Sequence, residues 1–338
     1  MPQDHSFLKP FRIALTCAWI ALLFGAGVII CTSNPSLLLV IKNLQERNLG
    51  LETMRWLPPD STSIPKNDEG KMIAYGRELV SHTAVYLGPR GKVNATSNGM
   101  NCQNCHLRAG TRRFGNNYSA VASTYPKFRE RSGTVESIEK RVNDCIERSL
   151  NGQALAVQSR EMRAIVSYIK WVGKDVPQKT IPEGAGIVKL PYLDRPADPV
   201  KGEAVYLAQC ARCHGLHGEG AMAMDGVEWK YPPVWGENSF NIGAGLFRLS
   251  RFAGYVKVNM PNDLATYEKP LLADEEAWDV AAYVLSLPHP AKDISSDWPD
   301  VSKKPVDHPF GPYADEFSEQ QHKFGPFAPI PDLRKKTK

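Results

Sequence analysis

Two short motifs combine cysteine and histidine at a spacing that could hold a metal-containing cofactor. In each, two cysteines stand two residues apart and a histidine follows directly: Cys102, Cys105 and His106, then Cys210, Cys213 and His214. Two thiols at this spacing can add to the two vinyl groups of one porphyrin, and the histidine can ligate its iron. One zinc site made from both cysteine pairs is less well supported, because the pairs lie in separate halves of the chain. The sequence therefore predicts two covalently bound haem c groups.

The second haem needs a sixth ligand, and a methionine stands where small c-type cytochromes present a thioether. Met260 follows the second motif and immediately precedes Pro261. Ligation by histidine and methionine raises the reduction potential of a haem. Lys257, slightly upstream, is a second candidate that could compete with Met260 for the iron.

The first half of the chain has no methionine in the corresponding place. Met162 is expected to pack in the core rather than to bind iron. Cys145 is the one cysteine after the N-terminal region that belongs to neither motif. Thiolate is a soft iron ligand, so we expect Cys145 to be the distal ligand of the first haem. A buried structural thiol is the ordinary alternative, and His82 is the main rival as ligand.

Basic and hydroxyl side chains accompany Cys145. Arg141 lies four residues before it and Ser149 four residues after it, so both lie on its side of one helix. Arg148 shares this side, and Arg131 lies upstream. A solvated basic face is the ordinary explanation for such arginines. The planar donor fork of arginine also suits oxyanions, and its charge favours the thiolate form of a nearby cysteine.

Longer strings around these residues resemble one known family. They are NCQNCHLRAGT (101–111), RxxxCxxRSLNG (141–152), YLAQCARCHG (206–215), NMP (259–261) and EEAWDVAAYV (275–284). Over roughly residues 56 to 330, the chain resembles the dihaem c-type thiosulfate dehydrogenase and tetrathionate reductase family. The arginine–cysteine string is the distinctive part, because the haem motifs alone occur in many cytochromes.

The resemblance implies roles for the candidate residues. In that family the first haem is the active site and has a histidine and a cysteine as axial ligands, which correspond here to His106 and Cys145. Arg131, Arg141 and Ser149 then lie near the substrate.

The second haem corresponds to the family's electron-exit haem. His214 and Met260 are its expected ligands, with Lys257 as the alternative to Met260. In the family, a cleaved signal peptide is the common arrangement at the N-terminus.

The resemblance also implies a reaction, in which two thiosulfates are joined into tetrathionate with the loss of two electrons, or the reverse. Two dianions about 5 Å apart repel each other by roughly 3 kcal/mol even in water, so cationic groups such as Arg131 and Arg141 must offset this. We expect Cys145 to leave the iron and form a Cys–S–S–sulfonate adduct with one thiosulfate, which the second thiosulfate attacks. Electrons would pass from the thiolate-ligated haem to the methionine-ligated haem and on to an acceptor such as a small cytochrome c.

Two other functions account for part of the sequence. A non-catalytic, membrane-anchored dihaem electron carrier explains both motifs, but it does not explain Cys145 together with Arg141 and Ser149. A sulfur-oxidation subunit acting on carrier-bound sulfur would need a protein-binding surface that the sequence does not reveal.

An internal repeat positions the two motifs. Each half has a short helix entered near a glycine (Gly76 or Gly202), then its CxxCH motif and finally an amphipathic helix, at 161–172 and 276–287. The apolar residues of these closing helices recur with helical spacing, whereas strand signals are weak. Cys145 lies in a further helical segment, 134–150. We predict a mainly α fold of two tandem cytochrome c-like helical domains, preceded by an N-terminal transmembrane helix.

The transmembrane helix is predicted from an apolar run. No charged residue occurs from 13 to 41, and the core at 13–31 is about as long as the ~20 residues that span a bilayer. Lys9 and Arg12 precede it, which places the N-terminus in the cytoplasm and the rest on the periplasmic side of a bacterial inner membrane. A retained anchor fits better than a cleaved signal peptide, whose apolar run is shorter.

Breaks in composition give the expected organisation. The bounds are 1–12 for a cytoplasmic N-terminus, 13–41 for the anchor or uncleaved signal, 42–70 for a tether, 71–175 for the first cytochrome c domain with the catalytic haem, 176–199 for a Pro/Gly-rich linker, 200–290 for the second domain with the electron-exit haem, and 291–338 for a Pro- and aromatic-rich tail packed on the domains.

The overall composition excludes other classes of protein. The 338 residues are 42% hydrophobic and 23% charged, which is typical of a folded protein. The net charge of +5 is mild and forms no basic stripe, so no nucleic-acid partner is expected. Seven cysteines are too few for a disulfide scaffold of this length.

Overall fold

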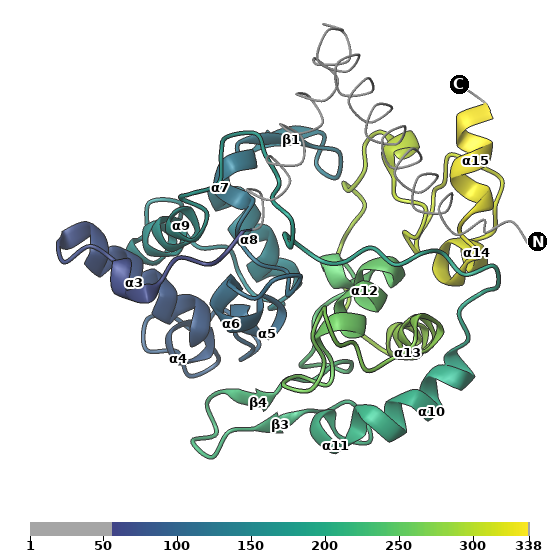
Figure 1. Ribbon diagram of the computed structural model, residues 1–338, viewed down its shortest axis with the longest axis horizontal. Coiled ribbons are helices and arrows are strands. Elements are labelled where there is room, and N and C mark those ends of the chain that lie inside the picture. Colours follow the sequence, from purple (N-terminus) through teal and green to yellow (C-terminus); the bar gives the residue numbers. More distant parts are fainter. Residues whose placement is uncertain (1–55, 337–338) are drawn as a thin grey trace, which may run out of the picture. The chain divides into compact units, whose positions relative to one another are not determined.

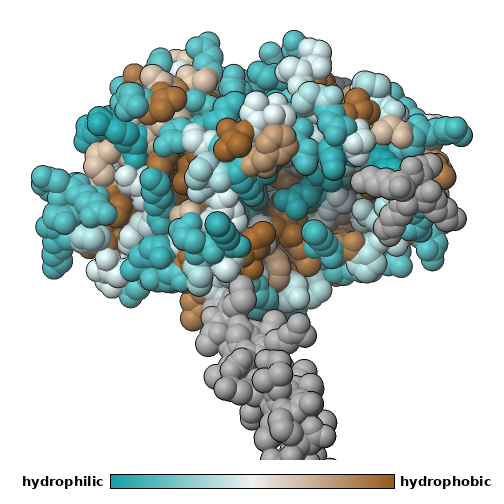
Figure 2. All heavy atoms as spheres, turned by 90° about the horizontal axis from the view of Figure 1, so that it is seen from above, coloured by the Kyte–Doolittle hydropathy of each residue, from teal (hydrophilic) through white to brown (hydrophobic). Residues whose placement is uncertain are grey.

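The computed structural model of this chain describes residues 56–336. The predicted anchor at 13–41 lies outside these residues, as does the first part of the predicted tether. Within 56–336, no helix is both long and apolar enough to cross a bilayer. On the face shown in Figure 2, hydrophilic residues predominate and hydrophobic residues lie in groups between them.

Two pairs of packed helices form the framework, one in each half (Figure 1). They are α3 (Asp68–Ser81) with α9 (Arg160–Val172), and α10 (Pro199–Gln209) with α13 (Asp274–Ser286). The closing helices α9 and α13 occupy almost the stretches predicted from their apolar stripes. Tyr168 of α9 and Trp278 of α13 are both 1% exposed and fill the centre of each core.

A glycine lets the two helices of each pair approach closely. A Cβ atom at Gly76 would lie 1.9 Å from the carbonyl oxygen of Ala164, and one at Gly202 would lie 1.9 Å from that of Asp279. No side chain fits at such a distance, so the two halves share the same close helix contact.

Capping side chains explain where α3 and α10, the first helix of each pair, begin. Asn67 accepts a hydrogen bond from the backbone N–H of Gly70 (3.0 Å) at the start of α3. Asp198 does the same for Val200 (2.9 Å) at the start of α10, where Pro199 occupies the first turn. Both are favourable capping arrangements, because the first N–H groups of a helix have no partner within the helix.

Shorter elements connect these helices. In the first half they are α4 (Thr83–Leu87), α5 (Cys102–Cys105), α6 (Leu107–Gly110), α7 (Val121–Thr124), α8 (Ile138–Arg148) and the antiparallel strands β1 (Lys127–Arg129) and β2 (Thr134–Glu136). In the second half they are α11 (Ala211–His214), α12 (Leu249–Asn259) and the antiparallel strands β3 (Ala221–Met222) and β4 (Trp229–Tyr231). Single 3-10 turns lie at Ser61–Ser63, Gly245–Phe247 and Val301–Lys303.

The segment 134–150 was predicted to be helical throughout, but the structure differs at its start. Its first three residues pair as β2, which suits the β-branched Thr134 and Val135. Ser137 then caps α8 by accepting a hydrogen bond from the N–H of Lys140 (3.3 Å). The helix that carries Cys145 is therefore shorter than the segment.

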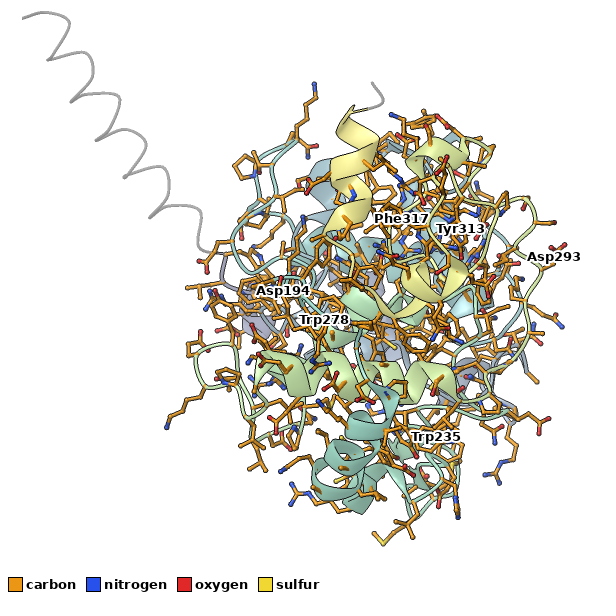
Figure 3. The ribbon with its side chains drawn as sticks, turned by 90° about the vertical axis from the view of Figure 1, so that its right-hand side faces the viewer. Asp194, Trp235, Trp278, Asp293, Tyr313 and Phe317 are labelled. Carbon is orange, nitrogen blue, oxygen red and sulfur yellow. The ribbon has the colours of Figure 1, made fainter. Side chains whose placement is uncertain are left out.

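The chain after residue 290 packs on the rest of the structure. It contains α14 (Glu319–Phe324) and α15 (Pro329–Lys336), and the side chains of Phe327 and Ile330 are buried. The ring of Tyr313 stacks on His322 at 3.7 Å between centroids, beside the C-terminal helices in Figure 3.

Candidate active site

Backbone contacts fix the helical turn α5 that carries the first cysteine pair. The N–H of Cys102 donates to Thr83 Oγ1 (2.9 Å), and the N–H of Asn101 donates to Asn104 Oδ1 (2.7 Å). Before haem attachment, burial raises the pKa of Cys102 to about 11 and that of Cys105 to about 12, so both sulfurs are then neutral thiols near pH 7.

The two motif histidines are oriented in the same way. His106 Nδ1 hydrogen-bonds the carbonyl oxygen of Asn116, and His214 Nδ1 hydrogen-bonds that of Pro232 (2.8 Å). A carbonyl only accepts, so Nδ1 carries the proton and Nε2 keeps the lone pair that a metal needs. The ring of Tyr118 packs on His106 with centroids 4.6 Å apart.

Cys145 on α8 lies next to His106, although the two are far apart in sequence. Burial alone would raise the pKa of Cys145, but the charge of Arg141 and the neighbouring His106 lower it to about 7. Cys145 is therefore partly thiolate at neutral pH, which is the form that binds soft metals and acts as a nucleophile.

These residues fit haem c in both halves. Each half offers two thiols and an imidazole whose Nε2 is free to bind iron, and the first half adds a thiolate beside that imidazole. In the second half, Met260 follows the last residue of α12 and packs against the hydrophobic core. Its role as ligand stays a prediction, as does that of Cys145.

The two rival ligands have other partners in the structure. Lys257 Nζ lies 2.6 Å from Asp274 Oδ1 and 2.6 Å from the carbonyl oxygen of Leu272. His82 Nδ1 lies 3.0 Å from Glu228 Oε1. Either residue would have to give up these contacts to bind iron.

Among the predicted arginines, Arg141 best fits the expected role of a cation beside Cys145. The charge of Cys145 is the largest influence on it and raises its pKa. In the part of the chain that the structure describes, the Arg141 guanidinium makes no ion pair within 4.0 Å. Its charge is thus available to an anion at Cys145.

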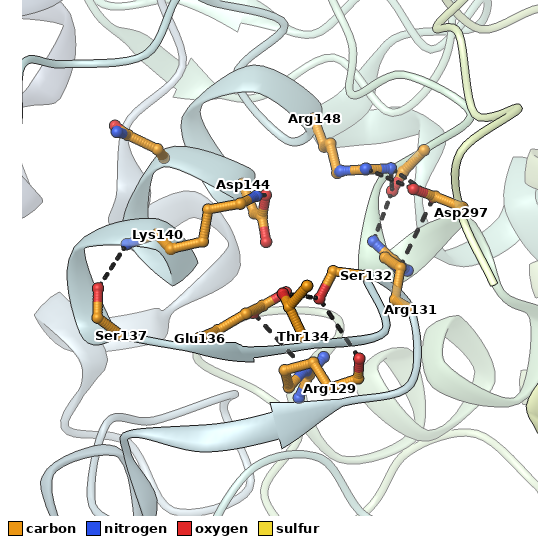
Figure 4. Close-up of polar contacts among 12 residues, drawn as sticks. Arg129, Arg131, Ser132, Thr134, Glu136, Ser137, Lys140, Asp144, Arg148 and Asp297 are labelled. Carbon is orange, nitrogen blue, oxygen red and sulfur yellow. Dashed lines mark hydrogen bonds and ion pairs between the residues drawn. The ribbon is translucent and has the colours of Figure 1, made fainter. Parts of the chain in front are cut away.

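Arg131, in contrast, is engaged with the C-terminal tail. Its Nη1 donates to the carbonyl oxygen of Gly243 (3.1 Å), and its Nε lies 3.9 Å from Asp297 Oδ2. Arg148 binds both oxygens of the same Asp297 carboxylate at 2.8 Å (Figure 4). These contacts fix Arg131 near the site but neutralise part of its charge.

Ser149 directly follows α8 as its C-cap residue. Its N–H donates to the carbonyl oxygen of Cys145 (2.8 Å), so its backbone closes the last turn of the helix. The structure brings Cys145, His106 and Arg141 together, with Ser149 one turn away.

Several residues near the site were missed by sequence reasoning. Arg129 lies on β1 and pairs with the buried Glu136 of β2 at 3.9 Å (Figure 4). The one local signal for Arg129 was its place two residues before Arg131, which lies in the turn between β1 and β2. No local signal pointed to Asp297 or to Arg251, because both come from distant segments.

The helix α12 connects the two halves beside the first motif. Tyr255 Oη donates to the carbonyl oxygen of Asn104 (2.9 Å), inside the first CxxCH motif. Asn259 Nδ2 donates to the carbonyl oxygen of Phe114 (3.0 Å) and directly precedes Met260. The same helix thus contacts the first motif and ends at the predicted ligand of the second haem.

Comparisons with known proteins match both halves. Residues 92–177 match the family model described as "SoxA/TsdA, cytochrome c domain", and residues 199–288 match the model for "Cytochrome c". The chain is 36% identical to a thiosulfate dehydrogenase from Psychrobacter arcticus over 244 aligned residues, and these residues cover 71% of each chain. It belongs to the thiosulfate dehydrogenase family.

Other members of the thiosulfate dehydrogenase family are similarly close. The relative from Allochromatium vinosum is 37% identical over 236 residues, which cover 69% of this chain and 83% of that one. The solved thiosulfate dehydrogenase (TsdBA) from Marichromatium purpuratum aligns with a TM-score of 0.63 and 33% identity over 68% of this chain. The alignment covers 49% of the TsdBA chain, so the present chain spans about half of its length.

Membership of the thiosulfate dehydrogenase family confirms the predicted resemblance. The two family-model matches also confirm the predicted fold of two tandem, mainly helical cytochrome c domains. The chain carries two covalently bound haem c groups, as its two motifs predicted. The bounds predicted for the domains and tail stay predictions.

Proposed function

We propose that this protein is a thiosulfate dehydrogenase, which couples two thiosulfates into tetrathionate and can run the same reaction backwards as a tetrathionate reductase. The observation that carries the proposal is Cys145, whose pKa is lowered by the unpaired cation Arg141 and by the motif histidine His106. The names of the similar proteins support the same activity.

Charge is the first requirement of the reaction. Two dianions have to meet, and their repulsion of roughly 3 kcal/mol at about 5 Å in water grows where water is excluded. Arg141 supplies a positive charge beside Cys145 to offset this repulsion. Arg131 and Ser149 are proposed to support substrate binding from the surrounding segments.

Cys145 is proposed to take part covalently. Its thiolate and the outer sulfur of one thiosulfate form an S–S bond, and two electrons leave. The outer sulfur of the second thiosulfate then attacks the sulfur bound to Cys145, which forms tetrathionate and releases the Cys145 thiolate. Atoms and charges balance, because two thiosulfate dianions give one tetrathionate dianion and two electrons.

The electrons leave through the second half of the chain. When bound, the two haems supply one-electron acceptors that together match a two-electron oxidation. Met260 is the proposed ligand that gives the second site the higher potential, with Lys257 as its rival. We propose a small cytochrome c or a similar redox protein as the external acceptor.

The location is proposed from the sequence outside the described residues. The uncharged run at 13–41 after Lys9 and Arg12 supports an anchor that holds both haem domains on the periplasmic side of the inner membrane. Cleavage of this run would release the same domains into the periplasm.

The experiment that tests the activity uses the protein with both haems attached. Thiosulfate should reduce ferricyanide in its presence, and tetrathionate should appear as the product. A purely electron-carrying cytochrome would exchange electrons with ferricyanide but would give no steady turnover with thiosulfate. The absence of turnover with both haems attached and reducible would therefore refute the proposed function.

A further inference from the structure

One face of α12 lies against the first cytochrome c domain. Arg251, Tyr255 and Asn259 are spaced four residues apart, so they occupy one side of this helix. Tyr255 and Asn259 donate hydrogen bonds to the carbonyl oxygens of Asn104 and Phe114 in the first domain. Arg251, one turn before Tyr255, therefore belongs to the face of the second domain that contacts the first.

Contacts on both sides of Arg251 in the sequence join its domain to the first domain. Burial lowers the pKa of Arg251, and after the neighbouring Arg248 the charges of Arg141 and Arg129 lower it further. Before Arg251 in the sequence, the carbonyl oxygen of Gly243 accepts a hydrogen bond from Arg131 (3.1 Å), and after it Tyr255 donates to that of Asn104 (2.9 Å), so Arg251 lies in a segment that contacts the first domain at both ends.

Most arginines of this region are paired with an acid. Arg131 and Arg148 share Asp297, Arg129 lies 3.9 Å from Glu136, and Arg248 binds Asp307.

Arg141 and Arg251 are the exceptions. Across residues 56–336, neither guanidinium makes an ion pair or a side-chain hydrogen bond. The acids whose charges act on them lie closer to other cations, because Asp144 binds Lys140, Glu136 lies 3.9 Å from Arg129 and Asp307 binds Arg248. Two partly buried cations without a counter-ion are unfavourable until an anion pairs with them.

We infer that Arg251 of the second domain binds the thiosulfate dianion together with Arg141 of the first, so that the two domains share one substrate site. The inference rests on the proposed function. Two unpaired guanidiniums match the double charge of thiosulfate, and each offers a planar fork of donors to the sulfonate oxygens. The substrate site is complete only when α12 is docked on the first domain.

The test measures thiosulfate binding without turnover. Cys145→Ala protein with both haems attached is titrated with thiosulfate by calorimetry, before and after the additional change Arg251→Gln. Loss of one charge-assisted contact should weaken binding by about 10- to 100-fold. The matched control is Arg163→Gln in the same background, which removes an exposed arginine of α9 and should leave the dissociation constant unchanged.

Three outcomes decide the inference. An unchanged dissociation constant with Arg251→Gln would overturn it while leaving the proposed function intact. Arg251→Lys, which keeps the charge, should recover part of the affinity, whereas a merely structural role would leave the lysine and glutamine variants alike. If Cys145→Ala protein bound no thiosulfate and the wild type showed no turnover, the proposed function itself would fail.

Discussion

At the scale of single residues, two opposing effects act on the sulfur of Cys145. Burial favours the neutral thiol, whereas Arg141 and His106 favour the thiolate, and the pKa of about 7 shows that the second effect is larger. A thiol with this pKa is close to half ionised at neutral pH, while an ordinary cysteine is largely protonated. The same surroundings therefore prepare Cys145 both as an iron ligand and as a nucleophile.

Replacing this sulfur separates the two roles. Cys145→Met supplies another sulfur ligand but no thiolate, so both haems should stay attached while thiosulfate turnover falls by roughly three orders of magnitude or more. Turnover is measured with ferricyanide, and haem content is measured by pyridine haemochrome. Near-normal turnover in Cys145→Met, or full turnover in Cys145→Ala, would show that the sulfur is not part of the reaction and would return His82 as the candidate ligand.

The ligand of the second haem can be tested by its spectrum. The oxidised protein should show the near-infrared band of a methionine–ferric iron bond, and Met260→Ala should remove it. Lys257→Gln should leave the band unchanged, because Lys257 is bound to Asp274. A band that survives Met260→Ala would assign the bond to another methionine. A band that appears only in Lys257→Gln would identify Lys257 as the ligand of the oxidised wild type.

At the scale of elements, the repeated helix pair was predictable because its signal is local. The stripe of Ile165, Tyr168, Ile169 and Val172 is buried in α9 as its spacing requires. The start of α8 was not predictable to the same accuracy, since Thr134–Glu136 becomes a strand only by pairing with β1. Strand pairing depends on a partner segment, whereas a helix satisfies its own backbone.

The close helix contacts predict which glycines cannot be replaced. Gly76→Ala and Gly202→Ala place a methyl group 1.9 Å from a carbonyl oxygen and should each destabilise the holoprotein by about 1–3 kcal/mol or more. Thermal unfolding of the haem-loaded protein measures this, with Gly245→Ala as control because a Cβ there meets nothing within 4 Å. An equal unfolding temperature for Gly76→Ala and Gly245→Ala would contradict the close contact.

At the scale of the whole described structure, charged residues from distant segments of the chain come together. Asp297 of the tail pairs with Arg131 and Arg148 of the first domain, and Arg251 of the second domain is inferred to bind the substrate together with Arg141 of the first. Sequence reasoning identified Cys145 and Arg141, because a short string carries both. It could not find Asp297 or Arg251, since no periodicity links segments that meet only after folding.

Asp307 of the tail accepts hydrogen bonds at the start of α12, and this contact predicts how the stability of the protein depends on pH. Asp307 is 1% exposed and accepts hydrogen bonds from Arg248 Nε (2.9 Å) and from the N–H of Ser250 (3.1 Å) in the first turn of α12. Burial would raise the pKa of Asp307, but Arg248 and Ser250 lower it overall. An aspartate whose pKa is lower in the folded than in the unfolded state stabilises the protein above the unfolded value of about 3.9. That contribution is lost as the pH falls through the folded value.

Asp307→Asn should therefore destabilise the haem-loaded protein by about 3 kcal/mol at pH 7, because Arg248 loses its buried partner. The difference from wild type should shrink as the pH falls below about 4, since Asp307 of the unfolded wild type then takes up a proton while the folded carboxylate stays ionised to a lower pH. Urea unfolding of both proteins between pH 7 and pH 3 measures this difference, and Glu237→Gln, at an exposed position, serves as the control for removing one negative charge. A difference that stays constant or grows on acidification would mean that Asp307 stabilises α12 without its charge, and the tail would then hold the helix by packing alone.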